Sequence, residues 1–323
     1  MRILSLDAGA FLKKYSVHEK KRADYDGKLK NLAEKGKARM GKHMNLHETQ
    51  ESGKEKRKID ILSKNGIEKY LLPQSMKKIM PSLTVLSETG STNTLLKKMA
   101  LEGAAEGTIV IADHQTGGRG RMGRSFFSPE GTGIYMSILL RPEDMKPSEA
   151  LKVTTMAAVA ACDAVEEVCG KNAMIKWVND IFIDGRKTMG ILTEASFGIH
   201  NNIEYAVLGI GMNAYAPEGG FPEEIEKIAG AVFDEKKEDG RNMLAASFIK
   251  HFFDYYEERD NSDYSRRYKE KSLAIGREIR VLSPEGEKRA FAMDVDDECR
   301  LIVKYPDETI EKLSSGEISI RLS

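Results

Sequence analysis

The sequence predicts an α+β protein in which a mixed β-sheet with flanking helices precedes a small β-barrel. Helical patterns alternate with short β-rich runs between residues 82 and 271, whereas residues 272–323 contain only short strands separated by turns. A length of 323 residues, of which 41% are hydrophobic, is enough for two or three domains. We therefore expect a globular protein rather than a fibre, a tail or a repeat array.

The composition excludes several classes of protein. The 50 Lys and Arg residues are balanced by 50 Asp and Glu residues, so the whole chain has no net attraction to nucleic acid or to an anionic membrane. No apolar run approaches the roughly 18–20 residues that span a bilayer, and no secretory signal follows Met1. Cys162, Cys169 and Cys299 lack the spacing of metal ligands or of a disulfide framework. We expect a cytoplasmic protein that does not contact membranes.

The first 60 residues differ from the rest of the chain. They contain 16 Lys and Arg against 9 Asp and Glu, and few large apolar residues occur between Lys28 and Lys58. Such a composition predicts a basic, poorly ordered extension with little packed core. A nucleic-acid-binding arm is the functional alternative, but we favour a solvated extension.

Residues 61–81 are predicted to be a linker or the remnant of another domain, and the main domain begins at about residue 82. Leu83–Leu86 forms the first strand-like run. Ser91, Thr92 and Asn93 then precede an apolar stripe, as at the N-terminus of a helix. Thr108–Ala112 and Gly133–Leu140 are the next predicted strands.

The second half of the main domain predicts a core helix, several hairpins and an aromatic helix. Apolar residues at helical spacing predict a helix over Ser148–Cys169. Four strands follow, at Met174–Val178, Ile181–Ile183, Thr188–Leu192 and Tyr205–Gly211. An aromatic stripe of Phe248, Phe252, Tyr255 and Tyr256 predicts one helix over Met243–Arg267, packed on the sheet. Five further strands predict the barrel, at Glu278–Leu282, Arg289–Val295, Leu301–Tyr305, Thr309–Leu313 and Gly316–Leu322.

A loop rich in glycine and arginine connects two of the predicted strands. It reads Gln115-Thr116-Gly117-Gly118-Arg119-Gly120-Arg121-Met122-Gly123-Arg124. Glycine lets the backbone approach a ligand closely, and a guanidinium presents donors that match phosphate or carboxylate oxygens. The loop is therefore predicted to close over an anionic group. Neither a Walker motif nor Gly-x-Gly-x-x-Gly is present, and a flexible segment that touches RNA is the weaker alternative.

A predicted β-hairpin brings a carboxylate and an ammonium group together. Asp184-Gly185 is a preferred two-residue turn. Such a turn sets four cross-strand pairs: Ile183 with Arg186, Phe182 with Lys187, Ile181 with Thr188, and Asp180 with Met189. Asp180, Phe182 and Lys187 then share one face of the hairpin. The alternatives are that Lys187 is an exposed strand lysine and that Asp180 is a turn acceptor.

Six motifs in order make the chain resemble the biotin protein ligases. They are Ser91-Thr92-Asn93, the loop at residues 115–124, Ser128-Pro129, Lys176-Trp177-x-Asn179-Asp180, Arg186-Lys187-x-x-Gly190-Ile191-Leu192 and Gly209-Ile210-Gly211-Met212-Asn213. The resemblance runs from about Ser82 to the end, where Ser315-Gly316-Glu317-Ile318-Ser319 is similar to the end of that family's SH3-like domain. It implies a class II aminoacyl-tRNA synthetase-like catalytic domain over residues 82–271 and an SH3-like domain over residues 272–323.

The resemblance also implies a two-step reaction. Biotin and MgATP give biotinyl-5′-AMP and pyrophosphate, and a lysine of a biotin carboxyl carrier domain, of the acetyl-CoA carboxylase type, then attacks the adenylate and releases AMP. The first step brings the biotin carboxylate and the α-phosphate together, so fixed cations must offset their repulsion. The loop would order when ligand binds and shield the adenylate from water.

The resemblance assigns roles to individual residues. Lys187, Arg119 and Arg121 would be catalytic, with Lys187 bridging the biotin carboxylate and the α-phosphate. The biotin site would comprise Ser91, Thr92, Asn93, Gln115, Arg119, Gly120, Arg121 and Lys187. The nucleotide site would comprise Arg121, Arg124, Phe126, Asn179 and Asn213, and Asp180 would hold Mg²⁺. Trp177 is either a core anchor or a wall of the site, and the core is favoured.

The sequence departs from the family pattern at three places. Phe126 stands where the family usually has Trp, which keeps an aromatic residue, and Val178 stands where it usually has Pro, which loosens the turn before Asn179. Bifunctional members carry a winged helix that represses biotin genes, but residues 1–70 lack a helix-turn-helix pattern. This predicts a ligase without repressor function, in which Lys64-Asn65-Gly66-Ile67 is at most the remnant of a wing.

Two other functions compete with this one. A lipoate ligase or octanoyl transferase would share the fold and a lysine, but the Arg-Gly-Arg loop followed by Lys-Trp-x-Asn-Asp favours biotin. A DNA-binding regulator that senses biotinyl-AMP is supported only by the basic extension. DNA binding is therefore not expected, whereas a homodimer is implied by the family resemblance.

Overall fold

The computed structural model describes residues 60–71, 79, 81–142, 145–198, 202–260, 263–283, 286–314 and 317–320. These residues belong to one compact unit that extends from Lys58 to Ser323. The extension predicted for residues 1–60 lies outside the described residues, except for Asp60. None of the described helices is both long and apolar enough to cross a membrane.

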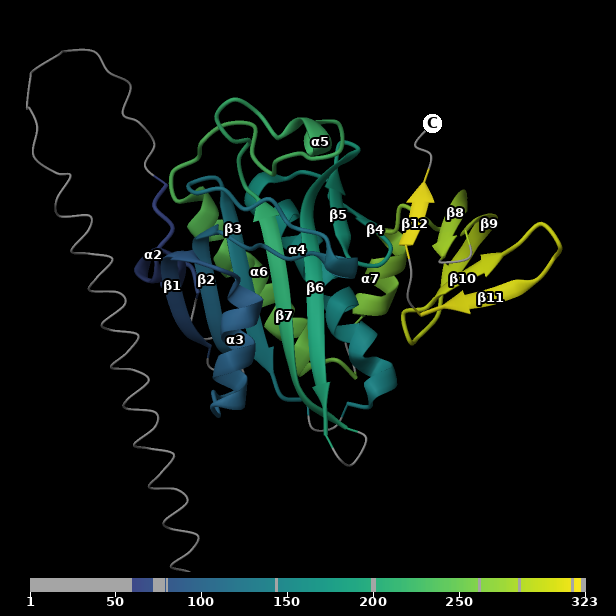
Figure 1. Cartoon of the computed structure of the whole chain (residues 1–323), viewed down its shortest axis with the longest axis horizontal. Helices are drawn as coiled ribbons and strands as arrows, with labels where there is room; N and C mark the ends of the chain where they lie inside the picture. Colours follow the sequence, from purple (N-terminus) through teal and green to yellow (C-terminus); the bar gives the residue numbers. More distant parts are fainter. Residues whose placement is uncertain are drawn as a thin grey trace, which may run out of the picture. The chain divides into compact units, whose positions relative to one another are not determined.

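A seven-stranded sheet forms the main domain, with the strand order β1-β2-β3-β7-β6-β5-β4 (Figure 1). β1 and β2 are parallel, and every other neighbouring pair is antiparallel. The strands are β1 (Ser82–Thr89), β2 (Thr108–Gln115), β3 (Gly133–Leu140), β4 (Met174–Lys176), β5 (Asp180–Ile183), β6 (Arg186–Phe197) and β7 (Ile203–Asn213). The predicted mixed sheet is confirmed, and each strand overlaps a predicted β-rich run.

Helices cover both faces of this sheet. On one face, α3 (Thr92–Leu101) packs on β2, β3 and β7, whereas α4 (Ala150–Cys169) packs on the other face and carries α6 (Gly240–Glu257) (Figure 1). The helix predicted after these polar residues is present, and Ser91 is its N-cap, because its side chain accepts a hydrogen bond from the Thr94 amide at 3.5 Å. The shorter helices are α2 (Lys64–Glu68), η2 (Arg121–Gly123), η3 (Pro147–Glu149), α5 (Glu223–Glu226) and α7 (Tyr264–Glu270).

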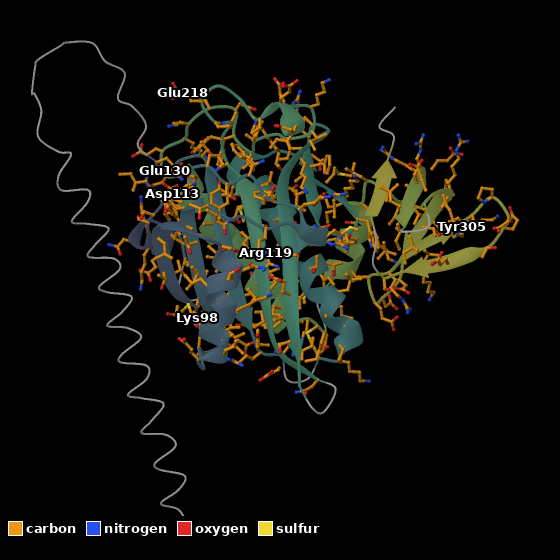
Figure 2. All side chains as sticks on the ribbon, viewed as in Figure 1. Lys98, Asp113, Arg119, Glu130, Glu218 and Tyr305 are labelled. Carbon is orange, nitrogen blue, oxygen red and sulfur yellow. The ribbon has the colours of Figure 1, made fainter. Side chains whose placement is uncertain are left out.

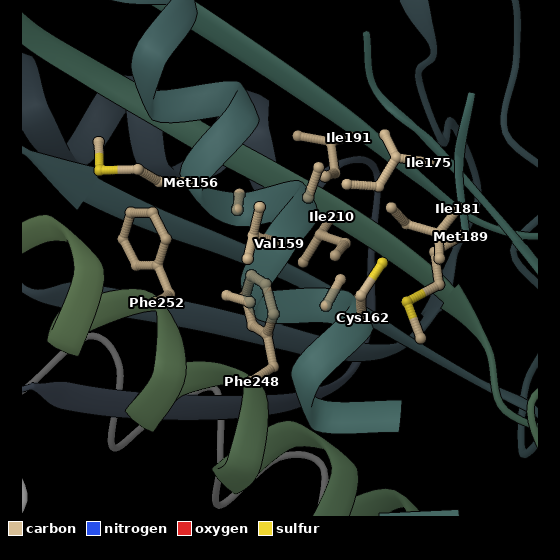
Figure 3. Close-up of a cluster of buried hydrophobic side chains, with 14 of the residues drawn as sticks. Met156, Val159, Cys162, Ile175, Ile181, Met189, Ile191, Ile210, Phe248 and Phe252 are labelled. Carbon is tan, nitrogen blue, oxygen red and sulfur yellow. The ribbon is translucent and has the colours of Figure 1, made fainter. Parts of the chain in front are cut away.

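The hydrophobic core lies between the sheet, α4 and α6. Figure 3 shows α4 carrying Val159 and Cys162 between the strand residue Ile210 and the α6 residue Phe248. Side chains alternate along a strand, so β3 sends Met136 to this core and its neighbour Ser137 to the opposite face, beside α3. The α3 face of the sheet is therefore where polar side chains can gather.

The helix predicted over Met243–Arg267 is wrong in length. α6 ends at Glu257, and α7 is a separate helix. The sequence between the two helices, at residues 258–263, is ERDNSD. Asp, Asn and Ser compete with the helical backbone for hydrogen bonds, which disfavours a continuous helix. The predicted aromatic stripe does face inward, because Phe248, Phe252 and Tyr256 are buried. It packs on α4 and only partly on the sheet.

The predicted hairpin register is half right. Ile183 pairs with Arg186 and Phe182 with Lys187, as expected. Beyond these pairs a β-bulge inserts Thr188 as an extra residue of β6, so Ile181 pairs with Met189 and Asp180 with Gly190. The predictions that Ile181 pairs with Thr188 and Asp180 with Met189 are therefore wrong. Asp180 and Lys187 nevertheless lie together, as described below.

The segment before β1 packs on the main domain. Lys64–Glu68 forms the short helix α2, not a strand of a wing, and the Ser63 side chain accepts a hydrogen bond from the Gly66 amide at its start. Ile67 is fully buried against α6. Asp60 receives hydrogen bonds from the buried side chain of Arg241 on α6. The residues predicted as a linker thus contribute to the core.

The C-terminal domain is a five-stranded antiparallel sheet in the order β11-β10-β9-β8-β12. This agrees with the predicted SH3-like domain, although Ser315 and Gly316 of the C-terminal motif lie outside the described residues. The Trp177 indole Nε1 donates to the Cys299 carbonyl of this domain at 3.3 Å. Trp177 is buried, which confirms the core anchor, and it also lines the loop cavity described below, so the two alternatives offered for this residue hold together. The strands are β8 (Arg277–Ser283), β9 (Gly286–Val295), β10 (Leu301–Lys304), β11 (Ile310–Leu313) and β12 (Glu317–Ile320).

Candidate active site

Two adjoining cavities lie on the α3 face of the large sheet. The loop cavity is lined by the loop at residues 119–126, by β4 and β5, and by the start of β6. The sheet cavity is lined by the first turn of α3, the end of β2 and the glycines of β7. Both cavities share Arg119, Phe126, Gly190 and Leu192 as lining residues. In Figure 2 the labelled Arg119 lies over the central strands of the sheet.

The loop cavity is strongly cationic. Among the described residues that line it, Asp180 carries the only carboxylate. The cations of its lining are Arg119, Arg121, Arg124, Lys176 and Lys187. Several fixed positive charges around one cavity attract and hold a polyanion such as a nucleoside triphosphate.

Lys187 is oriented by a carboxylate and by the backbone. Its Nζ lies 2.7 Å from Asp180 Oδ1. Its amide donates to the Ile228 carbonyl, and its carbonyl accepts from the Gly230 amide. Asn213 donates to the Gly230 carbonyl at 3.1 Å and lines neither of the two cavities. The structure thus does not bring Asn213 into the lining of the predicted nucleotide site. Asn213 instead contacts Gly230, whose amide is bonded to Lys187.

The glycine- and arginine-rich loop folds back on itself. The Gly120 amide donates to the Arg124 carbonyl at 2.7 Å, and Arg119 forms a bridge with Ser125. At the tip, Met122 has a left-handed backbone conformation, with φ of 55°, and a largely exposed side chain. Arg121 reaches across the cavity and donates through Nη1 to Asn179 Oδ1 at 2.9 Å. This contact joins the loop to the residue that precedes β5.

Phe126 stands between the two cavities. Its ring lies on the backbone of β6 and β7, because a Cβ on Gly211 would come within 2.4 Å of the ring and one on Gly190 within 3.2 Å. The Phe126 and Tyr135 rings form a T-shaped pair, with a centroid separation of 6.4 Å and an interplanar angle of 69°. Glycine at position 211 is therefore required for the aromatic residue to lie this close to the sheet, and a side chain at position 190 would press on the ring.

Polar groups of α3 and β2 form a connected network in the sheet cavity. The Thr92 amide donates to Gln115 Oε1 at 2.9 Å, and Gln115 Nε2 donates to Ser128 Oγ at 3.2 Å. Ser137 Oγ, which is fully buried on β3, lies 2.6 Å from Asn93 Oδ1 and 2.8 Å from Thr92 Oγ1. Such a network fixes the donors and acceptors that a polar ring would meet.

Asn93 is held on all sides. Its Oδ1 accepts from Ser137, and its Nδ2 donates to the Leu192 carbonyl at 3.2 Å and to Glu194 Oε2 at 3.0 Å. A Cβ on Gly209 would lie 2.1 Å from Asn93 Oδ1, so only glycine leaves room for this side chain. The asparagine therefore belongs to the floor of the sheet cavity.

Glu194 is a site residue that sequence reasoning missed. Its carboxylate forms ion pairs with Lys97 and Arg119 and accepts a hydrogen bond from Asn93. Partial burial alone would raise the pKa of the Glu194 carboxyl, but these contacts lower it below its ordinary value. The alternation of Gly190, Leu192 and Glu194 along β6 places all three on one face, which is the signal that was available. Lys176 and Ser137 were also missed.

The described residues contain no group of three or more His, Cys, Asp and Glu side chains that could hold a metal ion. A magnesium ion that accompanies ATP needs only one or two carboxylates beside the phosphate oxygens. Asp180 lies in the cationic cavity and supplies one carboxylate. The donor set therefore fits Mg²⁺ brought by the nucleotide.

Known proteins share both parts of this architecture. Residues 85–213 match the Biotin/lipoate A/B protein ligase family, and residues 274–321 match the Biotin protein ligase C terminal domain. Bifunctional ligase/repressor BirA of Bacillus subtilis is 35% identical over 238 residues, which cover 71% of this chain and 71% of BirA. Biotin–[acetyl-CoA-carboxylase] ligase of Mycobacterium tuberculosis is 31% identical over 245 residues, covering 73% of this chain and 88% of that protein.

A solved structure agrees with these relatives. The biotin protein ligase from Aquifex aeolicus in complex with biotin and ATP superposes with a TM-score of 0.63 at 26% identity. The superposition covers 76% of this chain and 100% of that chain.

Proposed function

The chain belongs to the biotin protein ligase family, and we propose that biotin occupies its sheet cavity and the nucleotide its loop cavity. The protein is an ATP-dependent ligase that activates biotin and transfers it to a protein acceptor. The observation that supports this division is the junction of the cavities. Arg119 and Phe126 line both, and the ammonium of Lys187 approaches Gly190, which also lines both.

Lys187 acts at this junction. Its ammonium bridges the biotin carboxylate and the α-phosphate, which repel each other as they react, and Asp180 orients it at 2.7 Å. Arg119 and Arg121 hold the phosphate side, and Lys176 and Arg124 add positive charge for the departing pyrophosphate. Asp180 would also hold Mg²⁺, which supplies neutralisation of the phosphate charges when bound.

The sheet cavity recognises the ureido ring of biotin. This ring offers two N–H donors and one carbonyl, and Ser91, Thr92 and Gln115 present polar groups to it. Asn93 forms part of the floor of this cavity. Leaving a buried donor of this kind without a partner costs about 1–3 kcal/mol, so a ligand without the ureido group is rejected.

The acceptor is the biotin carboxyl carrier domain of a carboxylase. The relative from Mycobacterium tuberculosis is named for acetyl-CoA carboxylase, which supports this choice of partner. The absence of a helix-turn-helix pattern in residues 1–70 supports a ligase that does not repress genes, although some relatives are named ligase/repressor. A homodimer and a cytoplasmic location remain predictions.

The test is incubation of the full chain with ATP, biotin and a carrier domain, followed by mass spectrometry of the carrier. We expect a mass gain equal to one biotinyl group, dependent on ATP, that excess lipoate does not suppress. A carrier whose acceptor lysine is replaced by arginine is the control and should gain no mass. Transfer of lipoate in place of biotin would contradict the proposal.

A further inference from the structure

The carboxylate of Glu194 links the two cavities although it lines neither of them. Glu194 lies on β6, with 18% of its side chain exposed, on the same face as Gly190 and Leu192. Lys97 Nζ contacts Oε1, and Asn93 Nδ2 donates to Oε2 at 3.0 Å. Arg119 Nη2 lies 3.3 Å from Oε1, and its Nη1 lies 3.5 Å from Oε2.

Arg119 needs such a partner because it is long and partly exposed. About half of its side chain is accessible, and a free arginine would sample many rotamers. The two guanidinium nitrogens face the two carboxylate oxygens, an arrangement that fixes direction as well as distance. Arg119 lines both cavities while it makes this contact. The pairing therefore holds the arginine inside the site and does not withdraw it.

We infer that Glu194 is a positioning residue for biotin activation: it orders Arg119 at the junction of the cavities before biotin binds and orients the Asn93 amide. This inference rests on the proposed function and adds a residue to it. Lys97 contacts the same carboxylate but lies outside the lining of both cavities. Lys97 therefore compensates the charge of Glu194 without contacting biotin or nucleotide.

The inference predicts an effect on biotin binding more than on turnover. A side chain ordered in advance does not lose rotamer freedom when the ligand binds. Removal of the charge in Glu194→Gln keeps the shape of the side chain and an acceptor for Asn93, but releases Arg119. The KM for biotin should rise about threefold to tenfold, because ordering one long side chain has a cost of that size. The KM for ATP should rise by no more than the KM for biotin, because Arg119 also lines the nucleotide cavity, and the kcat of pyrophosphate release should change by less than about twofold.

Lys97→Met is the matched control, since it removes an ion pair from the same carboxylate and leaves Arg119 paired. Its KM for biotin should stay close to that of the wild type. The wild type must itself release pyrophosphate only when biotin is present; its failure to do so would contradict the proposed function and not this inference. An unchanged or lower KM for biotin in Glu194→Gln, or an equal rise in Lys97→Met, would overturn the inference.

Trypsin provides a readout that does not depend on turnover. Trypsin cleaves the peptide bond after arginine, and the loop contains Arg119, Arg121 and Arg124. Loss of the Glu194 contact should raise the initial rate of cleavage at these bonds in Glu194→Gln relative to Lys97→Met, measured by mass spectrometry of the peptides. Equal rates in the two variants would count against the ordering of the loop by Glu194.

Discussion

At the residue scale, the chemistry depends on charged side chains whose partners fix their direction. Lys187 is a strand residue with about a third of its side chain exposed, and the sequence alone could not distinguish it from an ordinary surface lysine. In the structure its ammonium contacts Asp180. Its backbone amide and carbonyl are hydrogen-bonded to Ile228 and Gly230, respectively. A cation held in this way needs little reorganisation when two anions approach.

Replacing Lys187 by alanine should therefore reduce adenylate formation by about 100-fold to 1,000-fold, the loss typical of one preorganised charge contact in a transition state. Pyrophosphate release measures the rate, and far-ultraviolet circular dichroism checks the fold. Lys171→Ala is the control, because Lys171 forms an ion pair of similar length with Asp234 outside the lining of both cavities. An unchanged rate in Lys187→Ala would remove Lys187 from its proposed role.

Arg121 makes a different kind of contact, because it ties the loop to Asn179 across the cavity. In Arg121→Gly one cation of the phosphate side is lost, but Arg119 and the pair of Lys187 and Asp180 remain, so the first step should be slower but should largely continue. The loop loses its tether, however, and the adenylate should escape and biotinylate bystander proteins. Biotin incorporated into serum albumin, probed with streptavidin, measures the leak. Strict specificity for the carrier in this variant would contradict the clamp. Arg289→Gly, on the exposed part of β9, is the control.

At the element scale, β7 shapes the site through residues that have no side chain. Gly209 makes room for Asn93 and Gly211 for Phe126, so the strand presents a flat surface on the α3 face while its opposite face supplies Leu208, Ile210 and Met212 to the core. Period-two alternation thus serves two purposes along one strand.

Gly209→Ala should displace Asn93, because the added methyl group would lie 2.1 Å from its Oδ1. We expect biotin affinity to fall by about tenfold or more and the protein to lose about 1–3 kcal/mol of stability, the usual cost of overfilling a packed site. Calorimetry with biotin and thermal unfolding measure the two effects. Gly90→Ala is the matched control, since a Cβ there meets no atom within 4 Å; equal effects of the two substitutions would refute the explanation.

At the scale of the whole molecule, the C-terminal domain is attached to the segment that carries site residues. Cys299, in the turn between β9 and β10, contacts Trp177 through its carbonyl and Thr155 of α4 through its thiol. Burial raises the pKa of the Cys299 thiol, which keeps it neutral in this apolar position. The Lys176-Trp177 segment lines the loop cavity, so the small domain supports one wall of the active site.

Asp296 makes the stability of this domain depend on pH. Partial burial raises the pKa of its carboxyl, but hydrogen bonds from Arg300 and Lys312 outweigh this and lower it to about 2. An unfolded aspartate titrates at about 3.9, so between these values the unfolded chain binds more protons. The stabilisation is present in full above about pH 4 and is lost as the pH falls through 2.

Asp296→Asn should therefore lower the free energy of unfolding at pH 7 by about 1–3 kcal/mol, the contribution of hydrogen bonds to a charged group. The difference from the wild type should shrink between pH 4 and pH 2. Urea unfolding followed by circular dichroism at each pH measures it. A difference that stays constant down to pH 2 would show that the charge of Asp296 is not its cause.

The sequence by itself determined the order of the strands along the chain, the core helix over Ala150–Cys169 and the motifs that carry the charges, because hydrophobic period and turn residues are local properties. Only the tertiary structure decided which of those residues meet. The Asn213 side chain, for example, donates to the Gly230 carbonyl and lies outside the lining of both cavities, and the bulge at Thr188 changes which residues of β5 and β6 pair. Glu194 is the clearest case, since its partners Asn93, Lys97 and Arg119 lie 75 to 101 residues away in the chain. The alternation along β6 could place Glu194 on the face of the site, but which distant side chains it contacts is decided by how the chain folds.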